Sequence, residues 1–319
     1  MEKETFIFEQ DLLQMADRTR KKFCKDEVHL RGIIEFSNYC SRDCLYCGLR
    51  RDNKNITRYR MKPGEIVGLA VKIAAQGVNT IVLQSGDDFY YTQKSLCKII
   101  SQIKQKTGAA VTLSIGERPL DDYQAFKDSG ADRYLLKHET LNPALYRILH
   151  PGQNLKQRLK ILEYLKKIGF QVGSGNIVGL PNQSIKDLMR DVLLLKELDV
   201  DMAGIGPFIP QKDTPLADQP PGDLDLTLKV LAMARILTKN AHLPATTALA
   251  SLDRESGYLR ALKSGANVIM PDFTPASYQI NYRIYDNKID LSLKKAKQII
   301  SKAGRTISRG RGDSLKKRP

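Results

Sequence analysis

Three of the five cysteines lie within eight residues, in the pattern Cys40-x3-Cys44-x2-Cys47. Three thiolates on one short loop can bind three irons of a [4Fe–4S] cluster and leave the fourth iron without a protein ligand. An iron of this kind can bind a small molecule, so the cluster can catalyse a reaction as well as carry electrons. The spacing therefore predicts a catalytic iron–sulfur site at these three cysteines.

Two other kinds of cysteine site are less consistent with the spacing. A zinc site would need a fourth Cys or His close by, and none follows at a suitable distance. A redox dithiol formed by Cys44 and Cys47 would leave Cys40 unexplained. We expect Cys24 and Cys97 to be buried apolar side chains and not ligands.

Short β-branched runs alternate with amphipathic helical stretches along the whole chain. The predicted strands cover residues 28–36, 79–85, 109–115, 133–139, 170–179, 202–208, 244–249 and 267–272. The predicted helices cover residues 64–76, 94–106, 154–168, 184–198, 224–239 and 254–264. Eight strands with helices between them favour an α/β fold, a (β/α)8 TIM-type barrel in a single domain. A doubly wound open sheet is the alternative.

The barrel is expected to carry an extension at each end. We assign residues 1–27 to an N-terminal helical extension, 28–285 to the barrel, and 286–319 to a C-terminal helix and basic tail. The chain has 51 Lys and Arg against 35 Asp and Glu, a net charge of +16. From Lys302 onward there are seven basic residues and one acid. This tail is expected to be solvated or to contact an acidic partner.

Composition excludes several classes of protein. Hydrophobic residues at 42% and charged residues at 27% are typical of a folded globular chain. No run approaches the roughly 18 apolar residues of a membrane span, and the first residues lack an export signal. Clustered cysteines favour a reducing cytoplasm. With no Trp and 7% aromatics, nucleic-acid binding is not expected despite the charge.

Polar and small residues follow most of the predicted strands, where a (β/α)8 enzyme places its chemistry. The cysteine motif follows the first strand. The other groups lie at residues 84–88, 137–140, 173–181 and 204–207, which end the second, fourth, fifth and sixth strands. These segments are therefore expected to meet at one face of the barrel.

The cysteine motif, with Tyr46 before its last cysteine, resembles that of the radical S-adenosylmethionine (SAM) superfamily. Further segments resemble the HydE-type [FeFe]-hydrogenase maturases within it. They are residues 36–40, 44–53, 83–86, 131–140, 204–210 and 244–247, and the similarity runs from about residue 30 to Tyr285. The resemblance implies an enzyme that uses a [4Fe–4S] cluster to cleave SAM to methionine and a 5′-deoxyadenosyl radical.

The resemblance also assigns residues to SAM. It implies that Ser85, Gly86 and Asp87 receive the methionine amino group. Glu139 and Arg158 are implied to bind the ribose and the methionine carboxylate. The adenine is implied to lie against Tyr46, Met270 and the backbone of Ile205.

A substrate pocket is expected inside the barrel. Thr112, Lys137 and Thr247 are predicted to donate to an anionic, metal-bearing substrate, and Tyr282 and Tyr285 to close the cavity. The family more often has Arg at the position of Lys137, which keeps the charge but loses bidentate geometry. No cysteine follows Cys97, so a second cluster of the kind some relatives carry near the C-terminus is not expected.

The resemblance implies a role in hydrogenase maturation, on a small sulfur- and iron-containing precursor of the dithiolate ligand. The implied partners are other maturation proteins and a reductant such as ferredoxin or flavodoxin. The alternative is a radical SAM enzyme on another small thiol or amino acid, as in biotin synthase or methylornithine synthase.

Overall fold

The computed structural model describes residues 2–316, with side chains from residue 11 onward. Its strands are β1 (Glu27–Leu30), β2 (Gly32–Ser37), β3 (Thr80–Ser85), β4 (Ala110–Ser114), β5 (Arg133–Leu135), β6 (Gln171–Ser174), β7 (Ile177–Val178), β8 (Met202–Ala203), β9 (Gly206–Pro207), β10 (Val268–Ile269) and β11 (Thr306–Ile307). Every pairing between these strands is parallel.

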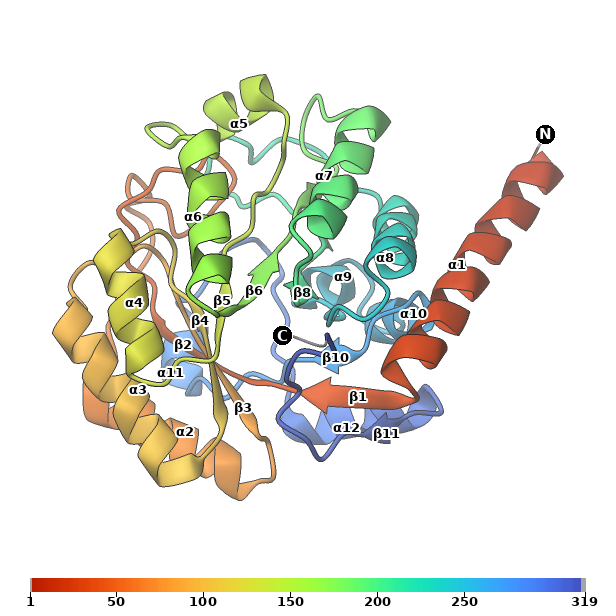
Figure 1. Cartoon of the computed structure of the whole chain (residues 1–319). Helices are drawn as coiled ribbons and strands as arrows, with labels where there is room; N and C mark the ends of the chain where they lie inside the picture. The colour runs from red at the N-terminus through yellow and green to blue at the C-terminus, as the bar shows by residue number, and fades with distance from the viewer. Residues whose placement is uncertain (1, 317–319) are drawn as a thin grey trace.

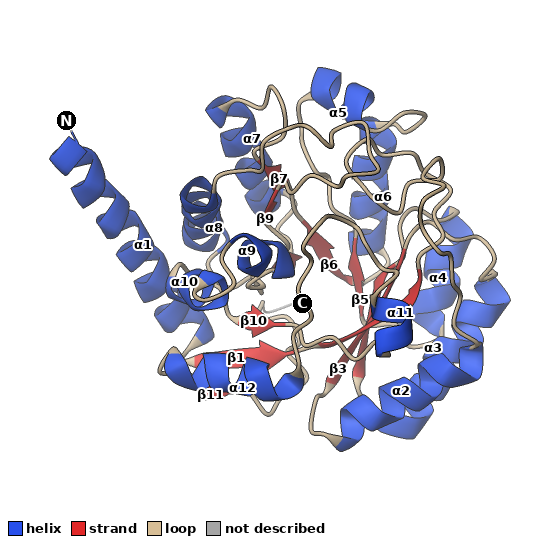
Figure 2. Ribbon diagram, turned by 180° about the vertical axis from the view of Figure 1, so that it is seen from behind, coloured by secondary structure: helices blue, strands red, loops and turns tan. Residues whose placement is uncertain are grey.

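The strands close into the expected eight-membered ring (Figure 2). Six of them pair in the order β2-β3-β4-β5-β6-β8. The seventh position is a short extended segment, in which His242 bridges to Met202 and Pro244 bridges to Val268. β10 then pairs with β1, which runs on into β2. The fold is therefore a closed (β/α)8 barrel and not an open sheet.

Helices surround the ring (Figure 1). They are α1 (Glu2–Cys24), α2 (Pro63–Ala75), α3 (Gln93–Thr107), α4 (Leu120–Asp128), α5 (Pro143–Leu149), α6 (Leu155–Lys167), α7 (Ile185–Glu197), α8 (Leu224–Thr238), α9 (Thr247–Leu252), α10 (Gly257–Lys263), α11 (Ala276–Gln279) and α12 (Leu293–Lys302). Local sequence sets several starts, since the side chains of Thr92, Asn154 and Ser184 each accept an N–H bond at an N-cap. Among the described residues, every helix is too short or too polar to cross a bilayer.

The alternation of side chains along each strand separates two interiors. In β2, Ile34 and Phe36 pack in the apolar core between the ring and the helices. Their neighbours Ile33 and Glu35 point into the barrel and line its cavity. β3 and β4 follow the same rule, and their inward residues include Gln84, Thr112 and Ser114. The core between the ring and the helices is therefore apolar, whereas the barrel interior carries polar side chains among apolar ones.

The predicted seventh strand, residues 244–249, is wrong over its second half. α9 begins at Thr247, and the hydroxyl of Thr246 accepts the N–H of Leu249 as its cap. Two consecutive threonines are typical of a strand, but a threonine also caps a helix well. The first predicted strand is present over residues 27–37 but is interrupted at Arg31, giving β1 and β2. The remaining predicted strands are present but shorter, and the fifth and sixth are each interrupted, giving β6 with β7 and β8 with β9.

The basic tail is solvated only in part, because its described part also packs across the end of the barrel where the strands begin. β11 pairs with β1, so that Thr306 lies opposite Glu27 and Ile307 opposite Val28. The buried guanidinium of Arg133 donates to the carbonyl of Arg311 and to Asp313, both at 2.8 Å. The tail therefore forms the floor of the barrel.

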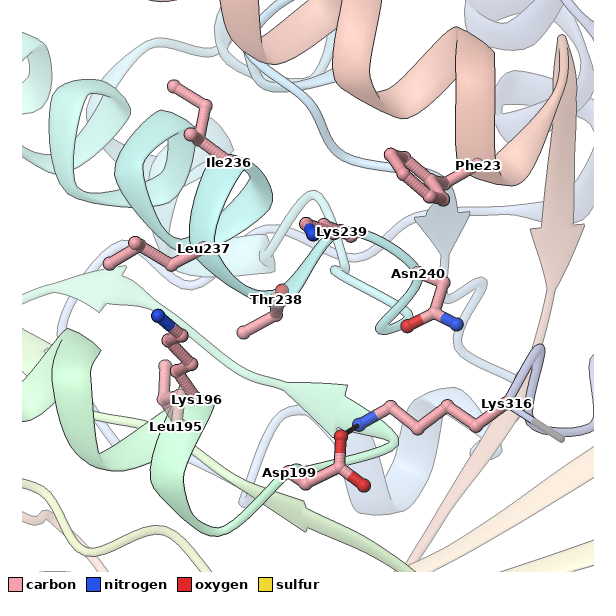
Figure 3. A pocket seen from close by; sticks show the side chains of 10 residues that line it. All are labelled: Phe23, Leu195, Lys196, Asp199, Ile236, Leu237, Thr238, Lys239, Asn240 and Lys316. Carbon is pink, nitrogen blue, oxygen red and sulfur yellow. Dashed lines mark hydrogen bonds and ion pairs between the residues drawn. The ribbon is translucent and has the colours of Figure 1, made fainter. Parts of the chain in front are cut away.

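The end of this floor borders a hollow of about 290 Å³ between α1, α7 and α8 (Figure 3). Lys316 reaches across it to form an ion pair with Asp199, and its ammonium donates to the carbonyl of Val200 at 2.7 Å. Phe23, from the end of α1, lines the opposite side. The N- and C-terminal extensions thus meet on the same side of the barrel. The first part of α1 projects beyond it (Figure 1).

Candidate active site

The cysteine loop follows β2, at the end of the barrel opposite the tail. The guanidinium of Arg58 holds this loop in shape, since it donates to the carbonyls of Asn38, Leu49, Arg50 and Asn53 at 2.5–3.1 Å. The side chain of Asn38 donates to two further carbonyls, both at 2.8 Å. Hydrogen bonds from these two side chains to backbone carbonyls therefore fix the loop that carries the three thiols.

Each cysteine of the motif is largely buried, and the surroundings supply donors to sulfur. The N–H groups of Arg42 and Asp87 donate to Cys40 Sγ at 3.4 Å, and Gln153 Nε2 donates to Cys44 Sγ at 3.2 Å. Burial raises the pKa of Cys40 to about 11 and of Cys44 to about 12, and it also raises the pKa of Cys47. Thiolates at this site therefore require bound positive charge, such as cluster iron.

The three cysteines form part of the wall of a cavity of about 410 Å³ inside the barrel. Residues from the strands and from the loops that follow them form the remaining walls. The loop after β3 approaches the motif so closely that only glycine fits at position 86. A Cβ there would lie 2.4 Å from the carbonyl oxygen of Tyr39 and 2.6 Å from Cys40 Cβ.

A chain of charged residues crosses the wall beside the cysteines. Arg42 Nε lies 2.7 Å from Asp87, and Arg42 Nη2 lies 3.3 Å from Glu117. Glu117 Oε1 also lies 2.9 Å from Arg158 Nε. Arg158 Nη2 donates to Gln153 Oε1 at 2.7 Å, which links it to the amide that contacts Cys44. Two arginines and two carboxylates thus alternate along this wall.

Lys137 and Glu139 form an ion pair on the adjacent wall. Lys137 Nζ lies 2.9 Å from Glu139 Oε2, and both residues line the cavity. Glu139 has a left-handed backbone with φ 65°, an uncommon conformation that is held because its N–H donates to Gly175 and its carbonyl accepts from Ile177. Burial, the largest single effect, raises the pKa of Glu139, but the combined pull of Lys137, His150 and Arg158 outweighs it, so the pKa is lowered.

A second charged group lies on the other side of the cavity. Lys288 Nζ lies 2.9 Å from Glu35 and 3.4 Å from Asp272. Burial raises the pKa of Glu35 to about 8, although Lys288 lowers it. Glu35 and Lys288 line the cavity with Tyr282 and Tyr285. The interior therefore offers both cationic and anionic groups to a polar ligand.

Comparison with known proteins places this geometry in a family. The model of the radical SAM superfamily matches residues 34–235. The [FeFe] hydrogenase maturase subunit HydE of Thermotoga maritima is 52% identical over 282 residues, which are 88% of this chain and 80% of that protein. The chain belongs to the HydE family of radical SAM enzymes. The implied family, fold and enzyme class are thereby confirmed.

Other relatives of the HydE family share the barrel. A 3-methylornithine synthase of Methanosarcina acetivorans is 26% identical, over 91% of this chain and 82% of its own. The crystal structure of methylornithine synthase matches with a TM-score of 0.85 at 24% identity, covering 94% of this chain and 89% of that chain. The maturase HydG of Carboxydothermus hydrogenoformans matches with a TM-score of 0.81 at 22% identity, covering 94% and 72%. These two structural matches establish the fold alone.

Membership of the radical SAM superfamily implies a [4Fe–4S] cluster and SAM, and the residues fit both groups. Among the described residues, no group of three or more His, Cys, Asp or Glu is arranged around a single metal ion. A cluster does not need that arrangement, because each thiolate binds a different iron. The charged wall that contains Arg42 and Arg158, together with the adjacent Glu139, offers cations and anions that suit the zwitterionic methionine end of SAM.

The structure brings together nearly all the residues that the sequence singled out in this HydE-family chain. Ile205 packs in the core and does not line the cavity, although its neighbours Gly204 and Gly206 do. All the others line one cavity: Cys40, Cys44, Tyr46, Cys47, Ser85, Gly86, Asp87, Thr112, Lys137, Glu139, Arg158, Thr247, Met270, Tyr282 and Tyr285. Their contacts with SAM and substrate stay predictions.

Several residues of the site were missed from the sequence. Glu117, which pairs with Arg42 and Arg158, comes three residues after β4, so its position after a strand was an available signal. Arg42 lies within the cysteine motif itself. Gln153 and Lys288 lie in loops after helical or strand segments and carry no local signature. Their place in the site follows only from tertiary contacts.

Proposed function

We propose that the chain cleaves SAM reductively at a [4Fe–4S] cluster bound by Cys40, Cys44 and Cys47, and acts in [FeFe]-hydrogenase maturation. The observation that carries this proposal is the position of the three thiols on one wall of a cavity inside the barrel, in a chain 52% identical to a HydE maturase. When bound, the cluster and SAM supply one electron and a 5′-deoxyadenosyl radical, and the protein supplies chelation, orientation and exclusion of water.

The residues near the cysteines would hold SAM. Arg158 is buried and already bound to Glu117 and Gln153, so its guanidinium is fixed in position before any ligand arrives. It suits the methionine carboxylate, and the carboxylate of Glu139 suits the ribose hydroxyls. Because Arg42 pairs with Asp87, this carboxylate would share its charge between Arg42 and the methionine amino group.

The substrate would lie deeper in the barrel. Thr112 Oγ1 is buried in the cavity wall without a hydrogen-bond partner, which marks it as a donor for a ligand. Lys137 and Lys288 provide ammonium groups on two sides of the same space, each paired with a carboxylate. These groups suit a small anionic precursor that contains sulfur and iron, which is the substrate class we propose.

The experiment that tests this function is reconstitution of hydrogenase maturation. The purified chain is added to the other maturation proteins and apo-hydrogenase, and hydrogen evolution is measured with the wild type and with Cys44→Ala. Activity that depends on the intact motif supports the proposal. Wild-type SAM cleavage without any maturation would instead favour another small thiol or amino acid, the alternative that the resemblance to methylornithine synthase suggests.

A further inference from the structure

A cleft of about 690 Å³ lies on the outer surface between α5, α6 and α7. It is separate from the barrel cavity, but the two share one wall residue, Gln153. The amide of Gln153 donates to Cys44 Sγ at 3.2 Å. A single side chain therefore separates this surface from a ligand of the proposed cluster.

The backbone makes a second connection between the cleft and the cysteine motif. The N–H of Leu45 donates to the carbonyl of Leu149, the last residue of α5, at 2.9 Å. The other neighbours of Gln153 reinforce the link, because its Oε1 accepts from the buried Arg158. A molecule seated in the cleft would therefore lie directly behind the loop that carries Cys44.

The charge and polarity of the cleft indicate what it binds. Arg147, Lys156 and Arg190 line it and are exposed, against one acidic lining residue, Glu197. Apolar side chains are exposed on the same helices, with Ile148 at 60%, Met189 at 49% and Leu193 at 42%. Basic side chains together with exposed apolar ones on the same helices are suited to a weak, electrostatically steered protein contact.

We propose that this cleft docks a small acidic iron–sulfur protein that delivers the electron for SAM cleavage. The inference rests on the proposed function, since it needs a cluster at Cys44. For each SAM cleaved, one electron leaves the reduced donor and ends on the sulfonium of SAM, whose C5′–S bond breaks. Acidic residues on the donor pair with Arg147, Lys156 and Arg190, and its cofactor faces Gln153.

The test compares two triple variants with the same change of charge. The cleft variant is Arg147→Glu, Lys156→Glu and Arg190→Glu. The control is Lys294→Glu, Lys295→Glu and Lys297→Glu on the exposed face of α12, away from the cysteine loop. Binding of an acidic ferredoxin is measured by calorimetry at low ionic strength, and SAM cleavage is measured with reduced ferredoxin or with dithionite. Iron content and circular dichroism check folding.

We expect the cleft variant to bind ferredoxin at least ten-fold more weakly, with the control close to wild type. Wild-type binding should weaken as salt is added. Ferredoxin-driven cleavage should fall in the cleft variant, whereas dithionite-driven cleavage should not. Equal loss of binding in both variants, or no loss in either, would overturn the docking site. If the cleft variant does not fold, Lys156→Gln with Arg190→Gln replaces it and is held to the same binding criterion.

Failure of the proposed function gives a different result. In that case the wild type would not cleave SAM with dithionite at all, whatever the state of the cleft. The binding measurement does not require turnover, so it still decides whether the cleft recognises an acidic ferredoxin.

Discussion

Arg158 Nε lies 2.9 Å from Glu117 Oε1, and both side chains are buried beside the cysteine motif. Arg158 is on α6, whereas Glu117 follows β4, so the pair joins two units of the barrel. An arginine on a helix face is often solvated, but the contact with Glu117 directs the guanidinium of Arg158 into the barrel.

We predict that Arg158→Ala and Glu139→Ala weaken SAM binding. Each change removes a charged partner from a desolvated site, which costs about 2–4 kcal/mol. Equilibrium dialysis with labelled SAM gives the dissociation constants, and iron content reports on the cluster. Lys160→Ala, at an exposed position of α6, is the matched control. Unchanged affinity in both site variants would contradict the assignment.

Lys137→Ala should make SAM binding sensitive to pH. Lys137 holds the pKa of Glu139 below its ordinary value against the effect of burial. Without Lys137, burial dominates and the pKa of Glu139 rises above that value, so the carboxylate is lost as the pH falls through this higher pKa. SAM affinity in the variant should then decrease toward acidic pH while the wild type stays constant. Parallel pH profiles in the two proteins would show that Glu139 does not contact SAM.

Gly86→Ala should prevent normal assembly of the cluster. The added Cβ would meet the backbone of Tyr39 and Cys40 at distances that real Cβ atoms do not adopt. The wild type should hold near ~4 irons per chain, the content of one cluster, and the variant much less. Gly68→Ala is the control, since a Cβ at that position of α2 has open space. Full iron content in the Gly86 variant would refute this packing argument.

Truncation after Gly304 should lower thermal stability. It removes β11 and two of the four acceptors of the buried Arg133, and leaving its Nη2 group unsatisfied costs about 1–3 kcal/mol by itself. Differential scanning calorimetry of the truncated and full chains measures the effect. Arg309→Ala, at an exposed tail position, should change little. Equal melting temperatures for the truncated and full chains would show that the tail does not stabilise the barrel.

The barrel could be predicted from the sequence because its signals are local and repeated. Buried β-branched runs followed by helices indicate parallel units, and eight of them favour closure. The predicted seventh strand ran too far because Thr246 and Thr247 both have a high β propensity. Thr246 is instead the N-cap of α9, a role that becomes evident only once the helix after it is known.

The candidate site could be predicted as far as its residues lie at strand ends or within a motif. Glu139 and Lys137 met this condition. The role of the tail did not, because Arg133 and Asp132, which pair with Asp313 and Arg311, lie more than 100 residues away in sequence. A basic run is usually solvated, and only the tertiary structure shows that Arg133 needs these acceptors. Gln153 could not be predicted either, because its contact with Cys44 joins residues that are 109 apart in sequence.

The central claim is that Cys40, Cys44 and Cys47 hold a cluster that cleaves SAM. The most direct measurement is release of 5′-deoxyadenosine by anaerobically reconstituted protein with dithionite and SAM. We predict release by the wild type and none from Cys40→Ala, Cys44→Ala or Cys47→Ala. Retained release in the variant that lacks all three cysteines would contradict the claim.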